Sequence, residues 1–114
     1  MKFIDGNFLV ITVATKKTRT YQQLIRSARV NGIPLKTLGM GEIWKGFGHK
    51  LLLVREELER HKDASDRIIL FVDAYDVLIN DGVEQILQRF QKFDARVVFS
   101  AEANCWPDED LKNK

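Results

Sequence analysis

The chain has 114 residues, of which 45% are hydrophobic and 30% charged, and this length and composition suit one globular domain rather than a disordered segment. The 18 basic and 16 acidic residues give a net charge of +2 without a basic tract, so nucleic-acid binding is not indicated. The single cysteine, Cys105, excludes an internal disulfide and makes a thiolate metal site improbable.

The first third of the chain predicts two strands around one helix. The run FLVITVA at residues 8–14 is continuously apolar and rich in β-branched residues, as in a strand buried on both faces. It is far below membrane-spanning length, and no signal peptide is visible. A helix is expected from Thr20, with Gln23 as its capping-box partner, to about Asn31. The segment at residues 33–39, IPLKTLG, predicts the second strand.

The middle of the chain predicts a loop and a second helix. Residues 39–50 contain four of the seven glycines and should form a loop with unusual backbone angles. Residues 50–61 predict an amphipathic helix with charged residues on one face. The opposite, apolar face is expected to hold Leu51, Leu52, Val54 and Leu58.

The last part of the chain predicts two more strands and a third helix. RIILFV at residues 67–72 and ARVVFSA at residues 95–101 are the expected strands. The helix between them, at residues 81–93, has Asp81 as a plausible N-cap. Its expected core face is formed by Ile86, Leu87 and Phe90.

This alternation of strands and helices predicts an α/β fold with a mostly parallel sheet and helices on both faces. No internal repeat, linker or low-complexity segment divides the chain, so residues 1–114 are expected to form a single domain. Ligands of such sheets bind beyond the carboxyl ends of the strands. The third strand delivers Asp73 to that edge.

Asp73 and Asp76 form the most informative polar pair in the sequence. Side chains alternate along a strand, so the two carboxylates would point apart unless the chain turns after Asp73. A turn places residues i and i+3 within about 7 Å at Cα, near enough for both carboxylates to bind one hard cation. Aspartate is also a common turn residue, and a solvated turn with Tyr75 packed at its side remains the alternative.

Other carboxylate and glycine chemistries fit this spacing poorly. A dehalogenase-type phosphohydrolase places its second Asp two residues after the first, whereas here the gap is three, which leaves a phosphohydrolase with Asp73 as nucleophile as a weaker alternative. The glycine-rich stretch matches neither a P-loop nor a dinucleotide fingerprint. Metal-dependent transfer from a nucleotide-sugar fits better, because a carboxylate pair can hold the cation that neutralises the leaving diphosphate.

Five linked motifs carry a family resemblance across nearly the whole chain. The motifs are LVITVATK (9–16), LGMGEIW (38–44), ILFVDAYDVLI (69–79), VVFSAE (97–102) and WPDEDL (106–111). Together they resemble the glycosyltransferase domain of the procollagen lysyl hydroxylase/glycosyltransferase family and, more distantly, the collagen galactosyltransferases. The resemblance implies the amino-terminal, nucleotide-binding half of a GT-A-like nucleotide-sugar-binding fold.

The resemblance also implies an activity. It is metal-dependent transfer of glucose or galactose from UDP-glucose or UDP-galactose to hydroxylysine or galactosyl-hydroxylysine of collagen-like acceptors, with Mn²⁺ or alternatively Mg²⁺, in the lumen of the endoplasmic reticulum. A non-catalytic interaction module that retains the fold is the other hypothesis. Whether this piece is active alone stays open.

The resemblance assigns roles residue by residue, while the catalytic residue itself stays unknown. Asp73 and Asp76 resemble the metal-binding pair, with a third, histidine ligand implied beyond residue 114. The implied nucleotide-sugar-binding residues are Thr12, Val13, Ala14, Thr15, Trp44, Lys50 and Tyr75. Glu102 and Trp106 are expected on the donor-sugar or acceptor side. Trp44 and Trp106 could instead be packing residues, and Lys50 a solvated residue of the first helical turn.

Overall fold

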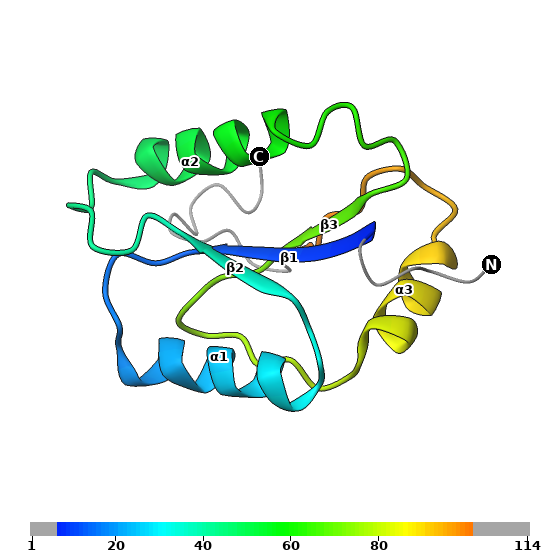
Figure 1. Ribbon diagram of the computed structural model, residues 1–114, viewed down its shortest axis with the longest axis horizontal. Coiled ribbons are helices and arrows are strands. Elements are labelled where there is room, and N and C mark those ends of the chain that lie inside the picture. Colours follow the sequence, from blue (N-terminus) through cyan, green and yellow to red (C-terminus); the bar gives the residue numbers. More distant parts are fainter. Residues whose placement is uncertain (1–6, 102–114) are drawn as a thin grey trace, which may run out of the picture.

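The computed structural model describes residues 7–101 and confirms an α/β fold with a parallel sheet (Figure 1). The elements in chain order are β1 (Phe8–Val13), α1 (Arg19–Val30), β2 (Leu35–Leu38), α2 (Phe47–Glu59), β3 (Ile68–Phe71) and α3 (Val83–Gln91). The three strands lie in the order β2-β1-β3. Both neighbours of β1 run parallel to it, with Val10 opposite Leu35 in one pair and opposite Leu70 in the other.

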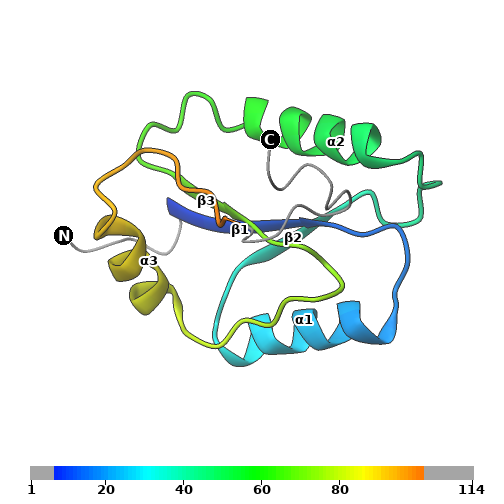
Figure 2. The same cartoon turned by 180° about the vertical axis from the view of Figure 1, so that it is seen from behind.

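The central strand β1 is buried on both faces, as its continuous apolar run predicts. Phe8 and Val10 face one side and pack in a cluster with residues of α1 and α3. Ile11 and Val13 face the other side and pack against α2. Accordingly, α1 and α2 cover opposite faces of the sheet in the front and reverse views (Figures 1 and 2).

The N-cap of helix α1 lies two residues before the predicted one. Its N-cap is Thr18, whose hydroxyl accepts a hydrogen bond from the backbone N–H of Tyr21 at 3.2 Å, rather than Thr20. The predicted end is close, because Asn31 is the C-cap. Tyr21, Leu24 and Ala28 are buried at the spacing of one helical face.

Helix α2 presents a different face to the sheet from the one predicted. The expected apolar face is wrong in three of its four positions, since Leu51, Leu52 and Leu58 are 69%, 55% and 45% exposed. Leu53 and Val54 pack on the sheet instead. The inward stripe is formed by Lys50, Leu53, Val54 and Glu57, at helical spacing, and His61 continues it just beyond the end of the helix. Because polar residues occupy both ends of this stripe, apolar periodicity alone selects the wrong face.

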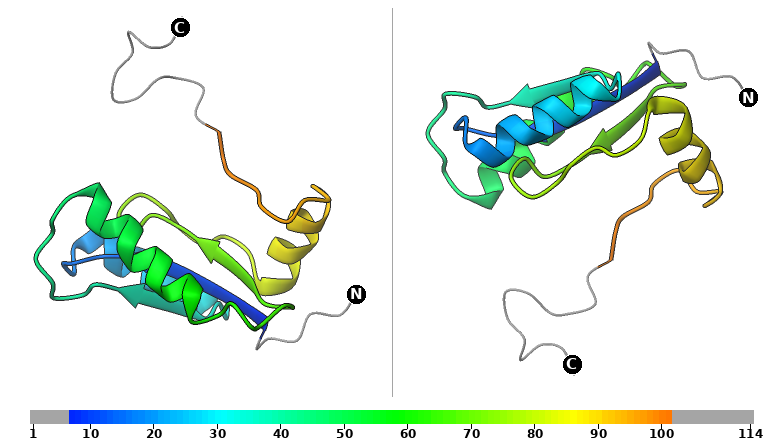
Figure 3. Two further views of the ribbon diagram at one scale, coloured as in Figure 1. Left: turned by 90° about the horizontal axis from the view of Figure 1, so that it is seen from above. Right: turned by 90° about the horizontal axis from the view of Figure 1, so that it is seen from below.

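The end of the described chain departs further from the prediction. Helix α3 has Gly82 as its N-cap rather than Asp81, whose carboxylate pairs with Arg89 at 2.7 Å. The predicted fourth strand is absent: residues 95–101 form no strand, and Val97 and Phe99 are 68% and 87% exposed. Figure 3 shows this orange segment leaving the body of the molecule after α3. An apolar run needs a partner to become a strand, and none pairs with it among the described residues.

Candidate functional site

A cleft of about 1030 Å³ opens at the carboxyl ends of β1 and β3. It lies where the chain leaves two neighbouring parallel strands, toward α1 after β1 and toward α3 after β3. Such a position is where open α/β sheets bind ligands. The cleft is lined by Val13, Ala14, Thr15, Lys16, Thr18, Thr20, Trp44, Phe47, Lys50, Asp73, Ala74, Tyr75 and Asp76.

The two carboxylates reach this cleft because the chain bends directly after β3. Residues 74–76 form the bend, and both Asp73 and Asp76 are exposed and line the cleft. Ala74 is buried, 3% exposed, in a small cluster with Ala14 and Tyr21. A small side chain at position 74 therefore lets the bend pack against the sheet while its neighbours face solvent.

The bend is anchored on both sides. Before it, the backbone N–H of Val72 donates to the carbonyl of Ile11 at 3.1 Å, which extends the β1 pairing past β3. After it, the backbone N–H of Ile79 donates to Ser27 Oγ at 2.9 Å, and Asn31 Nδ2 donates to the Ile79 carbonyl at 2.9 Å. The Asp73–Asp76 segment is thus held between the sheet and the carboxyl end of α1.

Lys50 is paired with Asp73 inside the cleft. Its Nζ lies 2.7 Å from Asp73 Oδ1 and 5.1 Å from the centre of the Phe71 ring. The lysine is in the first turn of α2, on the stripe that faces the sheet, and its side chain is 25% exposed. The short distance is that of a charge-assisted hydrogen bond.

Two aromatic side chains give the cleft an apolar surface. Trp44 is 47% exposed and packs edge-on against Phe47, with ring centres 6.1 Å apart. Tyr75 is 41% exposed, and its hydroxyl donates only a long 3.5 Å hydrogen bond to the carbonyl of Lys16. Both rings therefore keep accessible surface that a planar ligand could cover.

Val13, at the end of β1, and the following Ala14 and Thr15 line the cleft, whereas Thr12 does not. Thr12 is fully buried, and its hydroxyl donates to the carbonyl of Val72 at 2.7 Å. Thr12, for which a nucleotide-binding role is expected, thus makes no direct contact with the cleft. Its observed bond instead ties β1 to the segment that leads into Asp73.

Several cleft residues have no counterpart in the sequence-based prediction. These are Lys16, Thr18, Thr20, Phe47 and Ala74. The position of Thr18 and Thr20 follows from the start of α1, which a cap at Thr18 would have indicated. Phe47 enters because α2 begins three residues earlier than expected, with Gly46 at its N-cap in the left-handed region, φ 97°.

The carboxylate oxygens in the cleft are the type of ligand that a hard divalent cation prefers. Asp73 and Asp76 offer accessible carboxylate oxygens, and the ammonium group of Lys50 already stands at one of them as a cation. Within residues 7–101, no group of three histidine, cysteine or acidic side chains comes together. Glu102 and Trp106 lie outside the described residues.

A buried ion cluster lies toward the other end of α2. Glu57, 1% exposed, accepts hydrogen bonds at 2.9 Å each from Lys36 Nζ, Arg60 Nη1 and His61 Nε2. Burial raises the pKa of Glu57, but the bonds from Lys36, His61 and Arg60 outweigh it and lower the pKa from 4.5 to about 2. His61 Nδ1 accepts from Arg67 Nη1 at 2.7 Å, so Nε2 carries the proton donated to Glu57.

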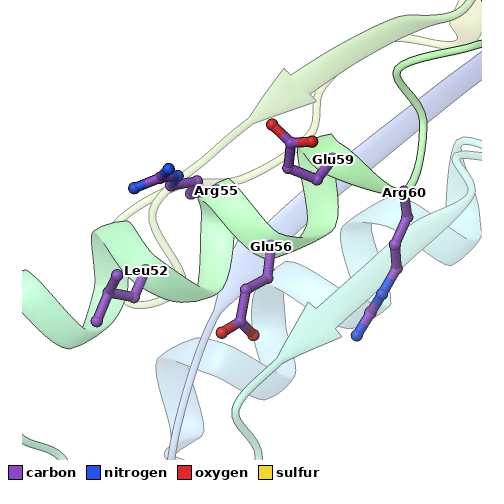
Figure 4. Close-up of a pocket in the computed structure, with 5 residues that line it drawn as sticks. All are labelled: Leu52, Arg55, Glu56, Glu59 and Arg60. Atoms are coloured by element: carbon purple, nitrogen blue, oxygen red, sulfur yellow. The ribbon is translucent and has the colours of Figure 1, made fainter.

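The outer face of α2 carries a second hollow that shares no lining residue with the cleft (Figure 4). It is lined by Leu52, Arg55, Glu56, Glu59 and Arg60, all from α2 and its C-cap. Figure 4 shows the carboxylates of Glu56 and Glu59 pointing away from the helix axis in different directions. This arrangement does not converge on a ligand atom.

Among residues 7–101, every helix is too short or too polar to span a bilayer.

Comparisons with known proteins match this chain along nearly its whole length. A family model described as the PLOD GT domain matches residues 4–114. The procollagen-lysine,2-oxoglutarate 5-dioxygenase of Drosophila melanogaster is 46% identical over 111 residues, which are 91% of this chain and 15% of that protein. The mouse procollagen-lysine,2-oxoglutarate 5-dioxygenase 1 is 40% identical over 97% of this chain and 16% of that protein.

A human relative combines two activities in its name. The multifunctional procollagen lysine hydroxylase and glycosyltransferase LH3 is 40% identical over 111 residues, 90% of this chain and 15% of that protein. The chain thus spans about one sixth of the length of the curated relatives it matches. Because the family model matches residues 4–114, the chain belongs to the PLOD GT domain family of glycosyltransferase domains.

Proposed function

We propose that this chain binds the donor in metal-dependent transfer of glucose or galactose from a UDP-sugar to hydroxylysine or galactosyl-hydroxylysine of collagen-like substrates. The observation that carries the proposal is the convergence of Asp73, Asp76, Lys50 and two accessible aromatic rings in one cleft at the carboxyl ends of β1 and β3. Membership of a glycosyltransferase-domain family supports the reaction class. The names of the relatives support a collagen acceptor. The lumen of the endoplasmic reticulum is proposed on the resemblance alone.

In this proposal Asp73 and Asp76 hold Mn²⁺, or alternatively Mg²⁺, and the ion supplies charge neutralisation at the donor diphosphate. Tyr75 and Trp44 offer ring faces for the uracil base. Lys50 supplies a second positive charge to the phosphates. Val13, Ala14 and Thr15 form the wall at the end of β1. Glu102 and Trp106 are proposed for the donor-sugar or acceptor side on the resemblance alone.

A non-catalytic module with the same fold is the second candidate. The observation in its favour is that only two carboxylates of the described residues converge with no third ligand among them, which would hold a divalent ion weakly. Such a module would bind a UDP-sugar or a protein partner without breaking the bond between sugar and phosphate.

Calorimetry of UDP binding with and without Mn²⁺ tests the proposal. In the full chain, Mn²⁺ should strengthen UDP binding by about 5- to 150-fold, the usual size of coupling between two ligands. Asp76→Asn should abolish most of this enhancement because it removes one of the two carboxylates. Asp63→Asn is the matched control, since Asp63 is an exposed carboxylate in the connection between α2 and β3 that does not line the cleft.

Hydrolysis of UDP-glucose and UDP-galactose in the presence of Mn²⁺ separates the two candidates. Release of UDP by the wild-type protein, lost in Asp76→Asn and retained in Asp63→Asn, supports the enzyme. Tight UDP binding without any hydrolysis or transfer to a hydroxylysine peptide supports the module. Equal UDP affinity with and without Mn²⁺ in the wild-type protein would contradict the metal-dependent proposal.

A further inference from the structure

We propose that Lys50 competes with the metal ion for Asp73, and that the donor diphosphate resolves the competition by drawing Lys50 away. Lys50 then couples metal binding to nucleotide binding. The inference rests on the proposed function and adds to it an order of preference: the metal binds poorly until the nucleotide is present.

The first support is the geometry of the pair. Lys50 Nζ lies 2.7 Å from Asp73 Oδ1, so the ammonium group occupies the space beside an oxygen that the metal would need. The Phe71 ring, 5.1 Å from Nζ, adds a favourable contact for a cation at the same place. Without a ligand, the cleft therefore already neutralises part of the charge that attracts a metal ion.

The second support is the way in which Lys50 is mounted. Its backbone N–H bonds to the Gly46 carbonyl at 3.4 Å in the first turn of α2, and Leu53 and Val54 of the same helix pack on the sheet. The Cα position is therefore fixed, while the four-carbon side chain can carry the compact charge to a new partner. A diphosphate in the same cleft is such a partner, because Lys50 and both aspartates line it.

The third support is the behaviour of charges that share one carboxylate. A divalent ion on Asp73 and the ammonium group of Lys50 at 2.7 Å from the same side chain would repel each other. Binding of the ion alone must therefore displace Lys50 into solvent. When a diphosphate is present, Lys50 moves to an anion, so the same displacement is favourable. By linkage, the nucleotide must then raise metal affinity and the metal must raise nucleotide affinity by the same factor.

The experiment measures Mn²⁺ affinity of the full chain without and with UDP, by following the electron paramagnetic resonance signal of free Mn²⁺. Lys50→Met removes the competing charge and keeps a flexible side chain of similar length. Its Mn²⁺ affinity without UDP should rise about two- to fivefold, which corresponds to about 0.4–1 kcal/mol, the usual range for an ion pair that is partly exposed. The factor by which UDP strengthens Mn²⁺ binding should fall.

Two further variants isolate the competition from a general change of charge. Lys45→Met removes an exposed lysine that precedes α2 and does not line the cleft, and it should leave Mn²⁺ affinity within about twofold. Lys50→Arg keeps a cation at the position and should bind Mn²⁺ without UDP as weakly as the wild type. Circular dichroism spectra that match the wild type establish that the variants are folded.

The possible results have distinct meanings. Tighter Mn²⁺ binding by Lys50→Met alone supports the inference. Unchanged or weaker Mn²⁺ binding by folded Lys50→Met, together with UDP-dependent Mn²⁺ binding by the wild type, overturns the inference and leaves the proposed function standing. Absence of Mn²⁺ binding by the wild type both with and without UDP overturns the inference together with the metal-dependent function.

Discussion

Replacement of the buried Glu57 by glutamine is a stringent test of the way α2 is fixed to the sheet. The change keeps the shape of the side chain and removes its charge. The glutamine would meet three donors, from Lys36, Arg60 and His61, with one oxygen acceptor and an amide group that is itself a donor. The variant therefore loses charge-assisted hydrogen bonds that a carboxylate alone can accept together.

The size of the effect follows from the pKa of Glu57. A decrease from 4.5 to about 2 on folding means that the ionised side chain stabilises the native state by about 3 kcal/mol at neutral pH. Because the pKa is lowered in the folded state, this stability is present above pH 4.5 and is lost as the pH falls towards about 2. Glu57→Gln should accordingly be about 3 kcal/mol less stable than the wild type at pH 7.

Urea unfolding of the 114-residue chain, followed by far-ultraviolet circular dichroism from pH 7 down to pH 2, measures this difference. The gap between wild type and Glu57→Gln should close as the pH falls, because a protonated glutamate resembles glutamine. Glu59→Gln provides the control, since Glu59 lies on the outer face of α2 (Figure 4) and should change stability by no more than about 0.5 kcal/mol. A gap below about 0.5 kcal/mol at pH 7, or one that stays constant with pH, would refute the reasoning.

Two further substitutions test the assignment of cleft residues. Thr12→Val removes the buried hydroxyl that bonds to the Val72 carbonyl and should cost about 1–3 kcal/mol of stability in urea unfolding. Because Thr12 does not line the cleft, the UDP affinity of the variant with Mn²⁺ should stay within about twofold of the wild type in calorimetry. A large loss of UDP binding by the folded variant would place Thr12 in the site. Tyr75→Ala should weaken UDP binding by about 1–3 kcal/mol, the usual value of stacking between a base and an aromatic ring. Tyr75→Phe should bind UDP as the wild type does, because the hydroxyl makes only a 3.5 Å contact with Lys16; equal losses in the two variants would argue against stacking.

The sequence predicts the arrangement of the sheet well because β1 carries an unambiguous pattern. Its unbroken apolar run requires cover on both faces, and the structure supplies α1 on one and α2 on the other. The turn after Asp73 is predicted for a comparable reason, since two carboxylates three residues apart cannot share one side of a strand. Both inferences rest on patterns within a few consecutive residues.

The predictions that fail depend on partners distant in the sequence. The sequence places Glu57 among the charged residues of its helix. The burial of Glu57 depends on pairing with Lys36, which lies 21 positions earlier in the chain. The apolar residues at 95–101 read as a strand, yet strand formation depends on an available edge rather than on composition. The nucleotide-binding role that the resemblance implies for Thr12 stays a prediction, whereas the bond from Thr12 to Val72, across 60 residues, is a contact that no local pattern indicates.

The bend is anchored by Val72 on one side and Ile79 on the other. These anchors separate ligand preference from stability, two properties that often oppose each other in protein engineering. The exposed positions Asp73, Tyr75 and Asp76 can be substituted to alter ligand preference, while the anchoring hydrogen bonds of Val72 and Ile79 lie outside them. A search for altered ion or donor preference can therefore be confined to side chains between the anchors. Substitution of Ser27 or Asn31, although neither lines the cleft, would loosen the bend and degrade every such preference at once.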